Sequence, residues 1–488
     1  MYIYNASQLD QRTLFQAGFG VPLSPKSMPW LYNSEQHATG SLVLARLLQS
    51  ERCQLVKEED AASAQLFLVP LVFSPKVPSS VAKVWDWVAP DEEDRLWSVC
   101  ERFYSQEWKS VLPHWTEATA ARHVFVPTDY FALLDFCRGA DPAFPLLVDA
   151  HPSNAKLLAR TPRISTGITL HRHTACAGTL SRQEIISAPL VSSVHLQVGD
   201  EQPWAVPRPR PHLVSYGGSR EGQPRASALR QLLVKQCAAW GNATCQLVDK
   251  QQLAATSDAL VDAFQAKLSS IFCLEPPGFG EHRKSQADAL TLGCIPVMFV
   301  PRADEGIWPL HWGGWRKDSR ILLDMDSVLN GSVDVKEVLE AIPAERVKQM
   351  QATIASNAHK IHYGALDTAD DALELLLHAL VDYAKNDAPQ DNLHPYPDCF
   401  DGWTQHDTRA DSWTLSELEK VNSSWRALRD RPCRDVLKAW GGCDAKAPSR
   451  KGRMYVRDVC MKTCGRCALS ASTAAPDRYT DTETWDPF

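Results

Sequence analysis

A short stretch near the middle of the chain combines residue types and spacing that suit the binding of an anion. Its loop at residues 276–280, PPGFG, lets the backbone approach a ligand closely, because glycine lacks a Cβ. Arg283, Lys284 and Ser285 follow at the start of an expected helix, where free N–H groups and the helix dipole favour an anion. Asp288 lies three residues after Ser285, on the same helix face. The pattern favours a nucleotide with its diphosphate at the helix tip and its ribose on Asp288; a solvated helix cap is the alternative.

Two apolar segments flank this helix and must position it. Ile271–Leu274 is long enough for a buried strand and too short for a helix, and Cys294–Val300 has the same character. The helix is expected to run from about Arg283 to a stop at Gly293. A strand–loop–helix–strand order requires a crossover between parallel strands, so the sequence predicts a parallel α/β sheet.

The same stretch is similar to a known signature. The string FCLEPPGFGEHRKSQADALTLGCIPVMF resembles that of the exostosin-type glycosyltransferases: a Phe-Cys-Leu strand, a Pro-Gly loop, an Arg-containing turn, Asp-Ala, then Gly-Cys-Ile-Pro-Val. The resemblance implies an α/β fold of the GT-B type, in which two Rossmann-like domains face each other across a cleft. It also implies inverting transfer of a sugar from a nucleotide-sugar.

Composition narrows the class of protein. A chain of 488 residues is long enough for two or more domains, and 44% hydrophobic with 22% charged residues is ordinary for a globular protein. The formal net charge of −7 argues against nucleic acid as the main partner. No run of about 18 apolar residues marks a transmembrane helix, and the first residues, MYIYNASQLD, lack a signal pattern.

Cysteines and glycosylation motifs indicate an oxidising compartment. The chain has 14 cysteines, and Asn-x-Ser/Thr motifs occur at Asn5, Asn242, Asn330 and Asn422. We therefore expect a location in the lumen of the Golgi or the secretory pathway. Since Tyr2–Tyr4 already resembles the first strand of the family's catalytic domain, we expect that an N-terminal membrane anchor is absent from this chain.

Residues 1–195 are expected to form the first Rossmann-like domain, on the acceptor side. Helical composition at Ser41–Leu48 precedes an apolar strand at Leu66–Val72. The segment 85–115 is rich in tryptophan, which favours a helical face packed on the sheet over a platform for stacking sugars.

An inverting transfer needs a group that takes a proton from the acceptor hydroxyl, a role for a carboxylate or a histidine of tuned pKa. RHVFVPTD at residues 122–129 resembles the Asp-His-Phe strand and His-Asp turn of the family, although the Asp and the His of the pattern are replaced. EIISAP at residues 184–189 resembles its acidic-Val-Val-Ile-Pro element. The candidate bases on this resemblance are His123, Asp129 and Glu184. The alternative is a structural histidine and carboxylates that cap turns.

Residues 196–385 are expected to form the second Rossmann-like domain, which would bind the nucleotide-sugar. The stretch QVGDEQPWAVPRPRP, at residues 197–211, predicts an extended linker because proline prevents a helix. His212–Gly218 predicts a strand ending in a glycine turn and resembles a Leu-Ala-Phe-Phe-Ala-Gly strand of the family. Of two arginines near the next helix, Arg225 is expected to assist at the phosphates in preference to Arg230. The predicted donor-binding residues are Gly217, Gly218, Arg225, Gly278, Arg283, Lys284, Ser285 and Asp288.

Three further features belong to this half. Cys237 and Cys245 are eight residues apart across a turn, which suits a disulfide. Tryptophans at 308, 312 and 315 are expected to pack in the core in preference to stacking on a ligand. Amphipathic helices are predicted at Pro343–Tyr363 and from about Ala369 to Tyr383, and the resemblance implies that such terminal helices cross back onto the first domain.

The C-terminal part differs in character. Residues 386–432 are expected to be a linker, and residues 469–488, rich in Ser, Thr and Asp, a disordered tail. Between them, residues 433–468 resemble the ShK toxin-like module, which three disulfides normally close. Only five cysteines lie in this span, Cys433, Cys443, Cys460, Cys464 and Cys467, so either Cys399 serves as the sixth or one bridge is missing. Zinc is the alternative.

The sequence thus predicts an inverting exostosin-like glycosyltransferase, hexosyl- or pentosyl-specific, that moves a sugar from a UDP-linked donor to a glycan or glycoprotein. No metal or other cofactor is expected, because basic side chains and a helix dipole can neutralise a leaving diphosphate. The alternative is a non-catalytic glycan-binding or scaffold protein that keeps the fold, which the diverged RHVFVPTD segment suggests.

Overall fold

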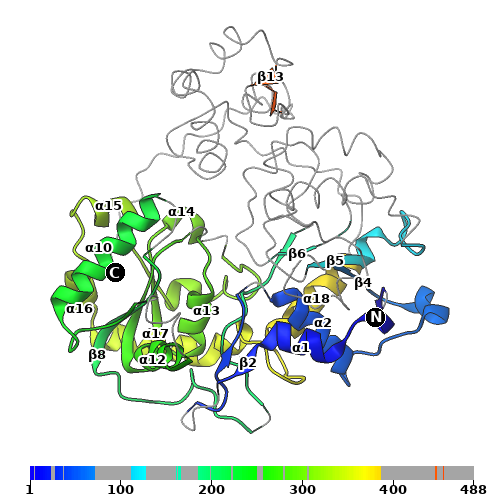
Figure 1. Cartoon of the computed structure of the whole chain (residues 1–488), viewed down its shortest axis with the longest axis horizontal. Coiled ribbons are helices and arrows are strands. Elements are labelled where there is room, and N and C mark those ends of the chain that lie inside the picture. The colour runs from blue at the N-terminus through cyan, green and yellow to red at the C-terminus, as the bar shows by residue number, and fades with distance from the viewer. Residues whose placement is uncertain are drawn as a thin grey trace. The chain divides into compact units, whose positions relative to one another are not determined.

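The computed structural model describes residues 1–71, 112–127, 161, 163–165, 185–385, 446–447 and 454–455, apart from residues 5, 24–27, 37, 198, 221–223, 250–256, 279–280 and 305–306. The chain divides into two compact units, and every described residue up to position 385 belongs to the first. That unit contains two parallel sheets (Figure 1).

The first sheet has five parallel strands in the order β1-β4-β5-β6-β7. These strands are β1 Tyr2–Ile3, β4 Phe67–Leu71, β5 His123–Pro127, β6 Arg163–Ser165 and β7 Ile185–Ser187. Between β1 and β4 the chain forms η1 Ala6–Gln8, α1 Gln11–Phe19, the hairpin of β2 Val21–Pro22 with β3 Tyr32–Asn33, α2 Thr39–Gln49 and η2 Glu58–Ser63. A further short helix, η3 Ala120–Arg122, leads into β5. Helix α2 is buried along most of its length because it packs between the sheet and other helices of this core.

The second sheet also has five parallel strands, in the order β12-β11-β10-β8-β9. These are β8 His212–Gly218, β9 Cys245–Asp249, β10 Ser270–Glu275, β11 Ile295–Met298 and β12 Ile321–Leu322. The interior strands β10 and β11 are almost entirely buried, which explains their continuous apolar sequence. From β8 the chain goes to β9 on one side and then returns to β10 on the other. The gap between β8 and β10 is therefore the topological switch point, where ligands bind in open α/β sheets.

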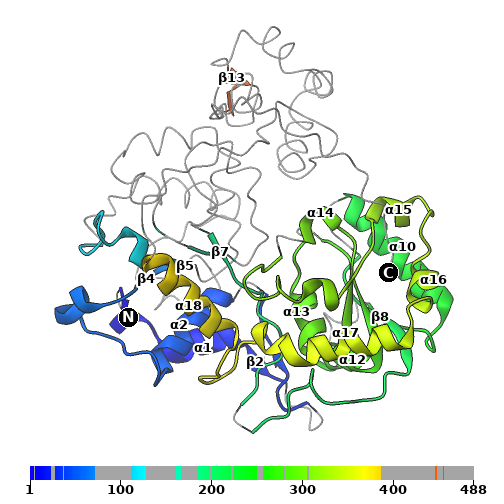
Figure 2. The ribbon, with the colours of Figure 1, turned by 180° about the vertical axis from the view of Figure 1, so that it is seen from behind.

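Helices cover both faces of this sheet. They are α10 Pro224–Trp240, α12 Ser257–Ser269, α13 Lys284–Thr291, α14 Pro301–Asp304, α15 Met325–Leu329, α16 Val335–Glu340 and α17 Ala344–Asn357, with η6 Arg316–Asp318 and η7 Ala358–Lys360. Right-handed crossovers place α10 on one face and α13 on the other, and both sides of the sheet can be compared in Figure 2.

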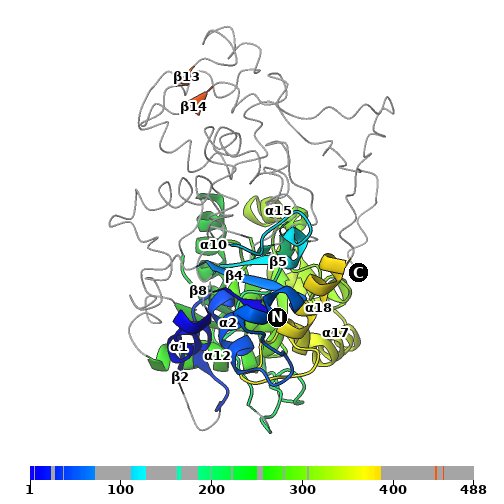
Figure 3. The ribbon, with the colours of Figure 1, turned by 90° about the vertical axis from the view of Figure 1, so that its right-hand side faces the viewer.

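The last helix of the unit returns to the first sheet. Helix α18, Ala372–Lys385, contributes Leu373, Leu376 and Leu380 to the core that α1 and α2 form (Figure 3). The buried ion pair of Arg46 Nη1 with Asp371 Oδ2, 2.8 Å apart, ties α2 to the start of α18. The expected return of the terminal helix is therefore confirmed, and residues 372–385 pack with the first half although the predicted boundary assigned them to the second.

Most predicted elements are present with shifted ends. The strands expected at Ile271–Leu274, Cys294–Val300 and His212–Gly218 are β10, β11 and β8. The helix expected from Arg283 is α13, and Gly293 follows it with φ +69°, as a helix stop requires. The helix predicted to reach Tyr363 ends earlier, at Asn357, where the 3-10 turn η7 follows.

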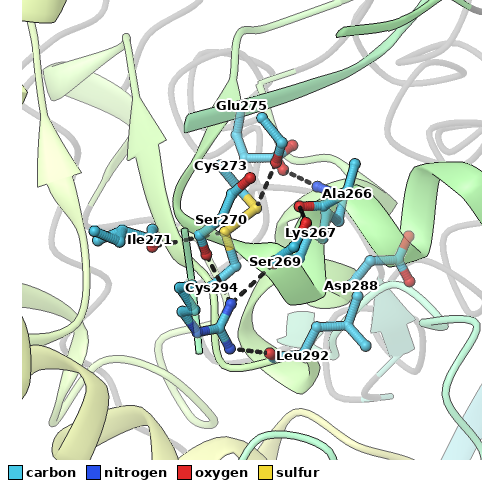
Figure 4. The surroundings of a disulfide bond; sticks show 12 residues. Ala266, Lys267, Ser269, Ser270, Ile271, Cys273, Glu275, Asp288, Leu292 and Cys294 are labelled. Atoms are coloured by element: carbon cyan, nitrogen blue, oxygen red, sulfur yellow. Dashed lines mark hydrogen bonds and ion pairs between the residues drawn. A yellow bond between two sulfur atoms is a disulfide. The ribbon is translucent and has the colours of Figure 1, made fainter. Parts of the chain in front are cut away.

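Two disulfides lie in the second half. Cys237–Cys245 joins the end of α10 to the start of β9 with a Cα–Cα distance of 5.3 Å, which confirms the predicted pair. Cys273–Cys294, with a Cα–Cα distance of 5.9 Å, was not predicted; it ties β10 to the residue before β11 (Figure 4). Both of its cysteines are fully buried.

In the second unit, Lys446–Ala447 and Met454–Tyr455 form the short antiparallel pair β13–β14. The cysteines of the expected ShK-like module lie outside the described residues, as do the expected linker and tail. Within the described parts of the chain, no helix is both long and apolar enough to cross a membrane.

Candidate functional site

The carboxyl ends of β8 and β10 bring two loops together at the switch point. Gly218 ends β8, and Ser219 follows it. Glu275 ends β10, and the Pro276–Gly278 segment leads from it toward α13. Because parallel strands end at the same edge of a sheet, loops far apart in the sequence meet here.

Arg230 joins the two loops. It lies in the second turn of α10 with only 3% of its surface exposed. Its Nη1 donates to Ser219 O at 2.7 Å, its Nε to Pro277 O at 2.6 Å and its Nη2 to Pro276 O at 3.2 Å. The guanidinium thus holds both loops in place, and burial lowers its pKa.

Arg283 lies beside Arg230, immediately before α13. Its guanidinium packs directly on Gly278: a Cβ at that glycine would overlap Arg283 Nη1 and come 3.1 Å from Arg230 Nη2. Burial, with the positive charge of Arg230 as a second cause, lowers the pKa of Arg283 to about 10. Among the described residues, the guanidinium of Arg283 donates no hydrogen bond and forms no ion pair, so its hydrogen-bonding capacity is available to a ligand.

Two buried carboxylates, Glu275 and Glu281, lie at these loops. Glu275, 3% exposed, forms an ion pair with Lys267 of α12 (Figure 4). Its negative charge also favours the charged forms of Arg230 and Arg283 and so opposes the lowering of their pKa by burial. Lys267, Arg230 and Arg283 carry three positive charges, and Glu275 and Glu281 carry two negative charges, which leaves an excess of one. Positive charge at a helix N-terminus complements a diphosphate.

Lys284 and Asp288 lie close to these residues but have other partners. Lys284 Nζ is 3.1 Å from both carboxylate oxygens of Asp288 and donates to Ser193 Oγ at 2.5 Å. Asp288, 5% exposed, also accepts the backbone N–H of Ser193 at 2.8 Å. Both side chains therefore connect α13 to the segment after β7. Protein groups contact both oxygens of Asp288, and its contact with ribose hydroxyls stays a prediction.

Of the remaining predicted donor residues, some lie at the two loops and others have partners elsewhere. Arg225 is directed to Asp326 of α15 in an exposed ion pair, so the structure brings Arg230, and not Arg225, to the loops. Gly217 and Gly218 lie at the end of β8, where an added Cβ would make only ordinary contacts. Ser285 is half-buried in the first turn of α13, and its carbonyl accepts a hydrogen bond from Lys267 at 3.4 Å.

Only one of the three candidate bases is described. His123 begins β5 and is fully buried, stacked on Phe67 with ring centroids 4.5 Å apart. Its Nε2 is 2.9 Å from Tyr4 Oη and its Nδ1 2.8 Å from Thr119 O, so neither nitrogen is open to an acceptor hydroxyl. Burial lowers the pKa of His123 to about 4. These contacts match the structural alternative, while Asp129 and Glu184 lie outside the described residues.

The tryptophans of the 308–315 loop are core residues, as predicted. Trp308 and Trp312 are fully buried, and Trp315 is 7% exposed. Trp312 Nε1 donates to Ser319 Oγ and Trp315 Nε1 to His311 O.

One Asp-x-Asp triplet, Asp324-Met325-Asp326, bears on the expectation that no metal is needed, because such triplets can bind metal diphosphates. Asp324 caps α15 by accepting Ser327 N at 2.8 Å, and Asp326 pairs with Arg225. The described residues contain no group of three or more His, Cys, Asp or Glu side chains placed to hold a metal ion.

A hollow of about 610 Å³ lies elsewhere, between α1, the end of α2 and β2. It is lined by none of the predicted site residues, and its walls carry no carboxylate and a single cation, Arg12. Residue chemistry therefore favours the arginine pair at the switch point as the functional site.

Comparison with protein families decides the relationship. The exostosin GT47 domain matches residues 2–319, a range that includes the first sheet, strands β8 to β11 of the second sheet and the arginine pair. The chain belongs to the exostosin GT47 family.

Curated relatives of this family member come from Arabidopsis thaliana. The probable xyloglucan galactosyltransferase GT15 is 30% identical over 31% of this chain and 32% of its own length. The probable xyloglucan galactosyltransferase GT20 is 25% identical over 69% of this chain and 54% of its own length. The xyloglucan-specific galacturonosyltransferase 1 is 38% identical over 19% of this chain and 14% of its own length. The chain therefore spans about half or less of the relatives it matches.

Solved structures resemble this GT47 protein weakly. The N-terminal domain of Candida albicans trehalose-6-phosphate phosphatase matches with a TM-score of 0.37 at 9% identity, over 70% of this chain and 93% of that one. The calicheamicin glycosyltransferase CalG4 matches with a TM-score of 0.29 at 14% identity, over 64% and 91%. Scores this low do not establish a shared fold.

Proposed function

We propose that this protein is an inverting glycosyltransferase of the GT-B type, which moves a hexosyl or pentosyl group from a nucleotide-sugar to a glycan or glycoprotein in the secretory pathway. Membership of the GT47 family and the two parallel sheets support this assignment. Two relatives are named as probable xyloglucan galactosyltransferases, which supports a polysaccharide as acceptor, and a UDP-linked sugar is the donor that we propose.

The observation that carries the proposal is the pair of arginines at the switch point, the buried Arg230 and the half-buried Arg283. The diphosphate of the donor would take the hydrogen bonds of Arg283 and the free N–H groups of the first turn of α13, while Arg230 holds the two loops around it. As the glycosidic bond breaks, negative charge grows on the leaving diphosphate, and preorganised positive charge stabilises that state. The proton acceptor would come from the first half, from Asp129 or Glu184 in preference to His123.

A direct test is the binding of UDP by calorimetry to wild type, Arg283→Ala and Arg225→Ala. Loss of Arg283 removes a charge-assisted hydrogen bond and should weaken binding by about 1.5–3 kcal/mol, on the order of 10- to 100-fold in Kd. Arg225→Ala is the matched control, because it removes an equal charge from the same half without touching the loops. Equal affinity in all three proteins would remove Arg283 from the site.

The charges of the site also suggest that no metal is needed. Activity, once a donor and acceptor pair is found, is expected to survive exhaustive EDTA treatment, because arginines and a helix dipole neutralise the leaving group. Activity lost in EDTA and restored by manganese would contradict this step and direct attention to Asp324 and Asp326. Donor binding without any transfer to a panel of glycans would favour the non-catalytic alternative.

A further inference from the structure

Two of the Asn-x-Ser/Thr motifs lie on exposed turns of the second half. Asn242, in Asn-Ala-Thr, follows α10, and Asn330, in Asn-Gly-Ser, follows α15. Both asparagines are exposed, as are Ala243 and Gly331, the middle residues of the motifs. A branched oligosaccharide attached to either side chain would extend into solvent without displacing a packed residue.

The turn at Asn330 presents the motif in an open, local conformation. Asn330 Oδ1 accepts the backbone N–H of Ser332 at 2.9 Å, which directs the other side-chain atom, the amide nitrogen, away from the chain. Gly331 has φ +78°, in the left-handed region that glycine adopts without strain. Ser332 is exposed beside the asparagine, and its hydroxyl donates to Ser327 O at 3.1 Å within the turn.

The turn at Asn242 is closed by a disulfide. Cys237 and Cys245 bracket it, and together with Cys273–Cys294 they place four described cysteines in disulfides. Disulfides persist in the compartments of the secretory pathway, where asparagine glycosylation also takes place. The side-chain amide of Asn242 makes no hydrogen bond with any described residue, whereas the backbone carbonyl of Asn242 accepts from Gln246 Nε2 at 2.6 Å.

From exposure, turn geometry and the oxidised cysteines together, we infer that Asn242 and Asn330 both carry N-linked oligosaccharides. In the reaction, the side-chain nitrogen attacks the anomeric carbon of a lipid-pyrophosphate-linked oligosaccharide. A C–N bond forms, the bond between that carbon and the pyrophosphate oxygen breaks, and the lipid pyrophosphate leaves with the electron pair. The amide nitrogen loses one proton, and nothing is oxidised or reduced. This inference is independent of the proposed enzyme activity.

The test uses the tagged chain, produced in cells of its source organism and purified without a reducing agent. After digestion, a peptide N-glycosidase in heavy-oxygen water converts each glycosylated asparagine to a labelled aspartate, which mass spectrometry detects in the peptide. We expect label at both Asn242 and Asn330. An unlabelled asparagine at either position would overturn the assignment of that position.

Matched variants separate the motif from the residue. Ser332→Ala and Thr244→Ala should each abolish the label at the preceding asparagine although that asparagine remains. Ser332→Thr and Thr244→Ser keep the hydroxyl and should keep the label. Label that persists in the alanine variants would show deamidation in place of glycosylation and would overturn the proposal.

Discussion

Lys284 and Asp288 form a polar connection between α13 and the segment after β7. Lys284, Asp288 and Ser193 satisfy one another at distances of 2.5–3.1 Å in a largely buried place. Burial lowers the pKa of Lys284, and the neighbouring carboxylate opposes that shift. Because each charge needs the other, the pair fixes the first turn of α13, and Arg283 is the residue immediately before that turn.

Removal of one partner should therefore be costly. Asp288→Ala leaves an unpaired buried ammonium and should destabilise the protein by about 3 kcal/mol, measured by urea unfolding. The double variant Lys284→Met with Asp288→Leu removes both charges and should be less destabilised than the single variant. An Asp288→Ala protein of normal stability that no longer binds UDP would instead support the predicted ribose contact.

The residue types of the site were predictable from sequence, but their partners were not. The spacing in the RKSQAD segment placed Arg283 at the helix start correctly. It could not show that Lys284 and Asp288 contact Ser193, which is 95 residues away from Asp288 in the chain. The sequence also favours Arg225 over Arg230, which the structure does not bear out. The three acceptors of Arg230 are backbone carbonyls of two loops that only the folded sheet brings together. Its position six residues after the start of α10, facing the sheet, was the available signal.

At the scale of elements, a buried disulfide strengthens the unit that carries the site. Cys273 lies on β10 and Cys294 just before β11. Cys273 Sγ is also 3.3 Å from Ser215 Oγ on β8, within hydrogen-bonding distance. Arg210 adds a second connection at this end of the sheet by donating to Lys267 O, Ser270 O and Leu292 O at 2.6–2.9 Å.

The double variant Cys273→Ala with Cys294→Ala should lose about 3 kcal/mol of stability, because the bond closes a loop with a sequence separation of 21. Thermal unfolding under non-reducing conditions measures the loss. Cys53→Ala is the control, since Cys53 is a free cysteine in the first half and outside this loop. A double variant as stable as this control would contradict the expected contribution, and so would free thiols at both positions in the wild type.

Sequence predicted the elements well where one periodicity or one breaker residue determines them. The apolar run of β10, the glycine stop after α13 and the spacing of Cys237 and Cys245 are local signals. The disulfide Cys273–Cys294 was missed because parallel strands pair across an intervening helix, and apolar runs hide cysteines among other buried residues. The end of helix α17 was predicted too late, because the apolar spacing continues through Ile361. Residues after Asn357 keep this spacing, but they form the 3-10 helix η7 in place of an α-helix.

At the scale of the whole unit, buried histidines lie where the chain passes between the two halves. His195 follows β7, with Nδ1 3.0 Å from Tyr363 O, and His362 accepts the N–H of Leu196 at 3.1 Å. His311 contacts Ala372 O, at the start of α18, at 3.0 Å. Burial lowers the pKa of His195 to about 3 and that of His311 to about 4, and lowers the pKa of His362 as well.

These shifts predict a loss of stability in mild acid. An unfolded histidine titrates near pH 6.5, so between that value and about pH 4 the unfolded chain binds more protons than the folded one. Stability should be greatest above pH 6.5 and fall as the pH decreases, by up to about 1.4 kcal/mol per pH unit for each buried histidine. Urea unfolding at several pH values measures the slope. His311→Gln should reduce this slope, and an unchanged slope in that variant would count against this origin.

The boundary of the folded unit follows from α18. This helix belongs to the first core through Leu373, Leu376 and Leu380, each of which contributes about 2 kcal/mol by burial, and through Asp371, which pairs with the buried Arg46. The compact unit ends at Ala388, so removal of everything after Pro432 takes away only residues of the second unit. That truncated protein should unfold cooperatively and bind UDP with the affinity of the full chain.

A second truncation after Tyr363 removes α18 and leaves Arg46 unpaired in an open core, and we expect it to be insoluble or unfolded by circular dichroism. If the first truncation also lost its cooperative transition, the C-terminal unit would be part of the same folding unit as the two sheets.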